Sequence, residues 1–235
     1  RIAKVLNAFR RQQNILEREL VYQKHCLEEK QGQIKAKGEE LAHWRSVREP
    51  EPERHPETES ARKALQEKGI PYLPFFAAVE FKTGVSPQER ERIEAASKEM
   101  GLLDALIVPA DKVHLVGKAD KVIIPCPQEL GYTLADYLYP TPVDGIGVSA
   151  ADIDKVLRSI VLATGSGGQT GMLEDGSYRI GLLQGQAPSQ ERAIYIGREA
   201  RLRHRQQVIS RLEGELAALE RELQELEIKK GQVEQ

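Results

Sequence analysis

The chain has 235 residues, enough for one large domain or two small ones. Charged residues make up 30% of the sequence and aromatic residues only 5%, which favours long solvated helices over a plain globule. The formal net charge of −2 excludes a nucleic-acid-binding role based on bulk charge, so any such role must rest on a local patch.

The sequence also indicates where the protein resides. No apolar run approaches the length of a membrane span, and no signal peptide is recognisable. Cys26 and Cys126 lie far apart without partner motifs, which fits free thiols in a reducing compartment. We therefore expect a cytoplasmic protein. The chain begins at Arg1 inside a helical pattern, so we also expect it to be a segment of a longer protein.

Residues 1–48 carry a heptad pattern that predicts an ascending coiled-coil arm. Position a is occupied by Leu6, Gln13, Leu20, Leu27, Ile34 and Leu41, and position d by Ile2, Phe9, Leu16, Gln23, Lys30, Lys37 and Trp44. Such a one-sided apolar stripe needs a partner helix to cover it. The polar d positions, together with Gly32 and Gly38, indicate a weaker middle stretch, where the arm either bends or simply tolerates polar residues.

Residues 197–235 repeat the pattern and predict a descending arm of similar length. Position a is occupied by Leu202, Ile209, Leu216 and Leu223, and position d by Leu212, Leu219, Leu226 and Val233. We expect the two arms to fold back on each other as an antiparallel pair, because the central segment holds them at high effective concentration. The alternative is that each arm pairs with its copy in a second chain.

Between the arms, residues 49–68 predict an extended or mobile proline-containing linker and a short helix over 59–68. Residues 69–196 predict a compact α/β domain. Its expected helices cover 87–100, 133–137 and 149–163, and its expected strands cover 72–81, 103–108, 121–124, 178–183 and 193–196. Asp175 and Gly176 predict a hairpin turn. The expected fold class is therefore α+β, with an antiparallel two-helix coiled coil capped by a mixed α/β domain.

A glycine-rich run over residues 165–171 suggests a phosphate-binding loop but lacks the lysine followed by serine or threonine of a Walker motif. The loop follows a predicted helix instead of opening one after a strand. The run is either a flexible connector or a glycine surface on which two copies of the chain approach each other closely in a dimer. The candidate dimer surface consists of Gly165, Gly167, Gly168, Gly171, Tyr178 and Ile180.

No residue pattern indicates catalysis. The five histidines are scattered without a second ligand at helical or hairpin spacing, so the sequence supports no metal site. Ser159 and Ser166 lack a nucleophile elbow, and we assign no catalytic residue and no cofactor.

A local basic cluster surrounds the start of the second arm. Its candidate DNA-contacting residues are Arg192, Arg198, Arg201, Arg203 and Arg205. Such a cluster could neutralise backbone phosphates and give salt-sensitive, sequence-independent DNA binding. The alternative is a solvated helix face paired with acidic residues of the first arm.

Four segments carry a resemblance to a known family. They are Ala77 to Phe81, Gly101 to Leu106, Asp175 to Gly181, and Tyr195 to Gly197 leading into a basic helix. Together with the order coiled coil, compact domain, coiled coil, they resemble the hinge region of SMC and Rad50-type ATPases. Within that group the sequence looks most like the MukB-like SMC subunit of Wadjet plasmid-defence systems.

The resemblance implies a hinge that homodimerises and arms that lead to ATPase heads encoded outside this segment. It also implies a nucleoid-associated complex with kleisin-type and nuclease subunits, which extrudes DNA loops and restricts plasmids. On this reading the segment itself is not an enzyme, and DNA contact is non-specific. Two other hypotheses stay open: a coiled-coil adaptor whose tip domain binds another protein, and an enzyme domain displayed on a stalk.

Overall fold

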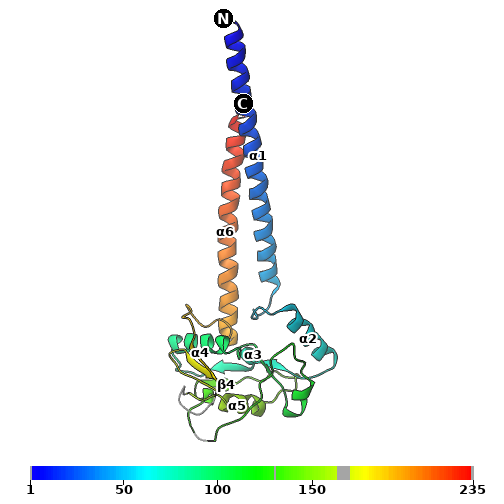
Figure 1. The fold of residues 1–235 in the computed structure, drawn as a ribbon, viewed down its shortest axis with the longest axis vertical. Helices are drawn as coiled ribbons and strands as arrows, with labels where there is room; N and C mark the ends of the chain where they lie inside the picture. The colour runs from blue at the N-terminus through cyan, green and yellow to red at the C-terminus, as the bar shows by residue number, and fades with distance from the viewer. Residues whose placement is uncertain (1, 130, 163–169, 234–235) are drawn as a thin grey trace. The chain divides into compact units, whose positions relative to one another are not determined.

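The computed structural model describes residues 2–129, 131–162 and 170–233. It combines long helices with short, mostly antiparallel strands, which confirms the predicted α+β class. The chain divides into two compact units (Figure 1): a coiled-coil unit of residues 1–48 and 205–235, and a central domain of residues 49–204.

Two long helices form the coiled-coil unit: α1 (Ile2–Ser46) and the distal part of α6 (Arg198–Val233). They run side by side in opposite directions (Figure 1), which confirms the antiparallel fold-back. Leu41 and Leu212 are buried at their contact, as the heptad pattern predicts. On α1, Leu6 and Phe9 are exposed, because α6 does not extend along that part of the helix.

The polar d positions of α1 reach across to the partner helix. Lys30 pairs with Glu222 at 2.6 Å, and Lys37 pairs with Glu215 at 2.9 Å. Their ammonium groups lie at the margin of the seam, where long aliphatic stems can pack while the charge stays solvated. The helix continues through the predicted weak stretch without a break.

The central domain begins with an extended linker and α2 (Pro56–Glu67). This helix starts three residues before the expected residue 59, because Pro56 takes a first-turn position and His55 provides the N-cap. The predicted strand over 72–81 is wrong as a single element. The structure divides it into β1 (Leu73–Pro74), a single helical turn α3 (Phe75–Ala78) and β2 (Val79–Phe81).

The interruption of that strand has a local cause. Pro74 has no N–H to donate to a ladder, and the N–H groups of Phe75 and Phe76 donate to the carbonyls of Ala105 and Leu103. The resulting turn buries both phenylalanine rings in the core.

Helix α4 (Pro87–Glu99) matches the predicted element closely. Ser86 and Glu89 form a capping box at its start, and Gly101 follows the helix with a φ of 68°. The strand predicted over 103–108 shrinks to β3 (Leu106–Ile107), which pairs antiparallel with β1. The strand predicted over 121–124 is wrong, because only Val122 forms an isolated bridge, to Leu106.

A 3-10 turn, η1 (Ala110–Leu115), connects these segments, and a second, η2 (Leu134–Asp136), lies within the predicted helix over 133–137. Strand β4 (Leu138–Pro140) pairs antiparallel with β2. Helix α5 (Ala150–Arg158) ends well before the expected residue 163. Val161, three residues beyond the end of this helix, bridges both Thr133 and Gly171, so the chain there is extended.

The last sheet is a three-stranded antiparallel meander of β5 (Gly171–Met172), β6 (Ser177–Ile180) and β7 (Leu183–Gln186). The hairpin turn predicted at Asp175 and Gly176 is confirmed. The strand predicted over 178–183 is wrong, because a second turn at Gly181 and Leu182 divides it between β6 and β7.

The core of the central domain joins α4, α5 and the small sheets through buried apolar side chains. Its members without measurable exposure include Phe75, Ile93, Leu134, Ile153, Leu157 and Met172. A smaller cluster around Leu65, Leu106 and Val108 packs α2 against the β1–β3 pair. Several short strands therefore share one hydrophobic core instead of forming one continuous sheet.

Candidate functional site

The segment that leads into α6 is held by a buried glutamate. The carboxylate of Glu94 accepts the N–H groups of Ile194 at 2.6 Å, Tyr195 at 2.9 Å and Ile196 at 2.7 Å. Only 1% of Glu94 is exposed. Burial raises its pKa, and the three N–H donors partly oppose that rise. The strand predicted over 193–196 is therefore wrong, because a side chain takes the N–H groups that a ladder would use.

Two further glutamates hold the same segment. Glu91 accepts the N–H of Gln190, and Glu80 accepts the N–H of Arg198 at 3.1 Å, where α6 begins. Between them, Gly197 has a φ of 96°, in the left-handed region that favours glycine, and a Cβ built there would meet the Glu80 carboxylate. A side chain at this position would therefore strain the backbone. The start of α6 is thus fixed by three carboxylates and one glycine.

Two of the five predicted DNA-contacting arginines are engaged inside the protein. Arg201 is buried, pairs with Glu49 at 2.7 Å, donates to the carbonyl of Tyr195 at 2.9 Å and lies over the ring of Phe76. In the coiled-coil unit, Arg205 donates to the last-turn carbonyls of α1, including that of Arg45 at 2.7 Å. The buried Arg201 guanidinium is therefore unavailable to a phosphate backbone, and Arg205 is half-buried with two of its three nitrogens engaged.

The other three predicted arginines are exposed. Arg198 pairs with Glu49 at 3.0 Å but leaves 73% of its side chain exposed. Arg192 has a single long ion pair, to Glu191 at 3.7 Å. Arg203 forms no ion pair within the described residues. The basic cluster is therefore smaller than the sequence suggests, with three accessible members.

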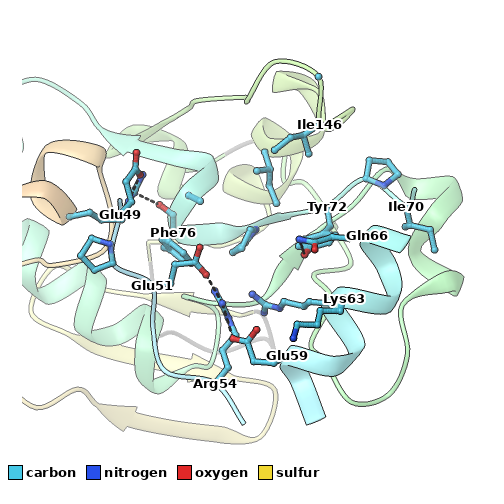
Figure 2. Close-up of a pocket in the computed structure, with 18 of the residues that line it drawn as sticks. Glu49, Glu51, Arg54, Glu59, Lys63, Gln66, Ile70, Tyr72, Phe76 and Ile146 are labelled. Atoms are coloured by element: carbon cyan, nitrogen blue, oxygen red, sulfur yellow. Dashed lines mark hydrogen bonds and ion pairs between the residues drawn. The ribbon is translucent and has the colours of Figure 1, made fainter. Parts of the chain in front are cut away.

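A pocket of about 600 Å³ lies between the linker, α2 and the β1–α3 segment. Figure 2 shows Arg54 beside Glu51 and Glu59 on one side and Tyr72 beside Gln66 on another. The linker that lines it is anchored along its length, in contrast to the mobile segment that was one of the predicted alternatives.

A buried ion-pair network supplies that anchoring. The carboxylate of Asp104 accepts two bonds from Arg54, both at 2.8 Å, and two from Arg62, at 3.0 and 3.1 Å. Arg62 also pairs with Asp120 at 2.7 Å. Burial lowers the pKa of Arg54, but the hydrogen bonds to Asp104 and Glu51 outweigh burial and raise it overall. No spacing in the sequence connects these four residues, so sequence reasoning missed the network.

The structure describes three of the six residues of the predicted dimer surface. Gly165, Gly167 and Gly168 lie outside the described residues. Gly171 lies in β5, and Tyr178 and Ile180 lie in β6, in the middle of the meander. The outer edge of β5 is bridged by Val161.

The opposite edge of the meander, β7, has no partner strand among the described residues. Leu182 in the turn before β7 is 100% exposed, and Leu183, the first residue of β7, is 71% exposed. Exposed leucines beside an unpaired strand edge are the features of the domain that most favour association with another chain.

Within the part of the chain that the structure describes, no three His, Cys, Asp or Glu side chains are grouped so that they could hold a metal ion. The described helices are also too polar or too short to cross a membrane.

No protein-family model matches the sequence, and no curated protein matches it. Among solved structures, the chain is similar to a Pyrococcus furiosus Smc hinge domain with an extended coiled coil, with 18% identity and a TM-score of 0.41 over 99% of this chain and 91% of that chain. It is also similar to an asymmetric dimer of the Geobacillus stearothermophilus SMC hinge domain, with 10% identity and a TM-score of 0.39 over 93% of this chain and 96% of that chain. Both similarities are to SMC hinge domains, at low identities and TM-scores.

Proposed function

We propose that this chain is a dimerising hinge that joins two coiled-coil arms, and that two copies associate through the β6–β7 hairpin. The observation that carries the proposal is the exposure of Leu182 and Leu183 beside the free edge of β7. A strand edge with exposed apolar side chains favours pairing with another strand, and a second copy of the chain supplies an identical edge.

The backbone of β7 is arranged for such pairing. Ile180 lies opposite Leu183, and Ala187 donates its N–H to the carbonyl of Gly176. Because hydrogen-bonded and non-hydrogen-bonded pairs alternate in an antiparallel ladder, the backbone N–H and C=O of Gln184 point away from β6. These groups are free to pair with another strand.

The side chains of the hairpin support the same surface. Cross-strand partners share a face, so Ile180 and Leu183 lie together, and Tyr178 lies with Gly185. A Cβ on Gly185 would lie 2.8 Å from the Tyr178 hydroxyl, so the tyrosine ring covers this glycine. Tyr178 and Ile180, from the predicted dimer surface, therefore belong to the face that extends to the exposed leucines.

The test is the molar mass of the whole chain by light scattering at micromolar concentration. We expect a dimer that dissociates when Leu182 and Leu183 are both replaced by glutamate. Gln184→Pro should also dissociate it, because proline removes an outward N–H without touching the bonds between β6 and β7. Ile124→Glu is the matched control, since Ile124 is 73% exposed elsewhere in the domain, and its dimer should persist.

A monomeric wild-type chain would refute the dimer. If that monomer instead captured a different protein through the same leucines, the coiled-coil adaptor would be the better function. A dimer that survives both hairpin variants would place the interface elsewhere.

We further propose that the parent protein is a MukB-like SMC ATPase of a nucleoid-associated complex that extrudes DNA loops and restricts plasmids. The support is the sequence resemblance of the four segments named above. On this proposal the ATPase heads lie outside the chain, and kleisin-type and nuclease subunits complete the complex. The full-length reading frame tests it, because Walker motifs should lie far away on both sides of this segment.

DNA contact is proposed for the three accessible arginines alone: Arg192, Arg198 and Arg203. They are solvent-exposed and come from the segment before α6 and from its first two turns. Fluorescence anisotropy with labelled duplex DNA should show binding that weakens steeply with salt and does not depend on sequence. Binding that is insensitive to salt would contradict this contact.

A further inference from the structure

Three arginines from three separate segments line one pocket of about 290 Å³ in the central domain. Arg90 comes from α4, Arg192 from the segment before α6, and Arg203 from the second turn of α6. We infer that this pocket, the three-arginine pocket, is a binding site for a phosphate group.

The guanidinium groups keep unused donors for a ligand. Arg90 lies over the ring of Phe81 and uses its Nε to donate to the carbonyl of Val85 at 2.9 Å, which leaves its two terminal nitrogens available. Arg192 has only its long ion pair with Glu191, and Arg203 has none within the described residues. Arginine forks match the geometry of phosphate oxygens and bind them in pairs.

The charges around the pocket also favour an anion. Two carboxylates line it, those of Glu80 and Glu199. Glu80 accepts the N–H of Arg198 at the positive end of the α6 helix dipole, which partly compensates its charge. Three guanidinium groups thus face two carboxylates, and the pocket keeps a net positive charge. This charge favours an anion such as a phosphate group over a cation.

The rest of the lining is apolar and comes from Val85, Pro87, Ala193, Ile196 and Ala200. An apolar floor lowers the local dielectric, so an arginine–phosphate pair there is stronger than on a flat surface. The phosphate could belong to a small phosphorylated molecule or to the backbone of DNA. In the second case the inference deepens the proposed DNA contact and rests on it.

The experiment titrates the whole chain with inorganic phosphate by phosphorus NMR and, separately, with a fluorescein-labelled DNA oligonucleotide by anisotropy. We expect Arg192→Ala and Arg203→Ala each to weaken phosphate binding about tenfold or more, because each removes charge-assisted hydrogen bonds. Arg90→Lys keeps the charge but loses the fork, and should weaken binding less. Arg158→Ala is the matched control, because Arg158 is an exposed arginine of α5 that does not line the pocket, and this variant should leave phosphate binding unchanged.

The DNA titration identifies the source of the phosphate. If the pocket variants weaken DNA and phosphate in parallel, the site holds the DNA backbone; if they weaken phosphate alone, the ligand is a small molecule. Both outcomes support the pocket. No phosphate binding by the wild-type chain, or equal losses in Arg192→Ala, Arg203→Ala and Arg158→Ala, would overturn it. The proposed dimer is measured by light scattering and would be unaffected.

Discussion

Replacing Glu94 by glutamine tests whether this buried carboxylate holds the start of the second arm. A glutamine has one acceptor oxygen where the carboxylate has two. If that oxygen replaces Oε2, the bonds from Tyr195 and Ile196 persist, and the N–H of Ile194 faces an NH₂ group. One buried N–H is then left unsatisfied, which costs about 1–3 kcal/mol.

The two remaining bonds also lose their charge assistance, at roughly 0.5–1 kcal/mol each. Relief from burying the charge offsets this second loss, because burial outweighs the hydrogen bonds in setting the pKa of Glu94. We therefore expect Glu94→Gln to lower the free energy of unfolding by about 1–3 kcal/mol, the cost of the unsatisfied N–H, measured by urea unfolding at neutral pH. Glu99→Gln is the control, because Glu99 is exposed on the same helix and should change stability little.

Hydrogen exchange locates the effect. The amides of residues 194–196 should be protected in the wild-type chain and should exchange much faster in Glu94→Gln, ahead of the rest of the central domain. A variant as stable as the wild type, with these amides still protected, would refute the role assigned to Glu94.

Three further predictions follow from the buried polar groups. Burial raises the pKa of Glu94, so protonation of this side chain favours the folded state. The stability gained in this way should be fully present below the unfolded-state pKa and lost as pH rises through the folded-state pKa. The difference in free energy of unfolding between wild type and Glu94→Gln should therefore widen when urea unfolding is moved from neutral to acidic pH. Asp104→Asn removes the carboxylate shared by two buried arginines and should destabilise the central domain by about 3 kcal/mol, measured by urea unfolding, whereas Asp111→Asn at an exposed pair should have almost no effect. Gln23→Leu should stabilise the coiled-coil unit by about 1–2 kcal/mol in a thermal melt followed by circular dichroism, because Gln23 is a buried d residue whose Oε1 has no hydrogen-bond partner within the described residues.

The helices of this chain were predictable because their signals are local. The heptad repeat predicts both arms, and Ser86 with Glu89 predicts where α4 begins. Ser149 and Asp152 mark the start of α5 in the same way. In each case the residues that determine the structure lie within a few turns of one another.

The short strands were less predictable because their partners are distant in the sequence. The segment 193–196 has the composition of a strand, yet its N–H groups are taken by Glu94, about 100 residues earlier. The 72–81 segment is apolar except for Glu80, yet the carbonyls of Leu103 and Ala105 accept hydrogen bonds from its middle, which forms a helical turn. Tertiary hydrogen bonds override local strand propensity in both cases.

The candidate sites, like the secondary structure, were predictable only where their signals are local. The sequence by itself determined that two amphipathic arms flank a mixed domain and that arginines gather where the second arm begins, because periodicity and composition are properties of neighbouring residues. Only the tertiary structure decided which of those arginines are accessible: Arg201 and Arg205 are engaged internally, whereas Arg192 and Arg203 join Arg90 in one pocket. The physical reason is that burial and ion pairing depend on residues far away in the chain, which no local pattern specifies.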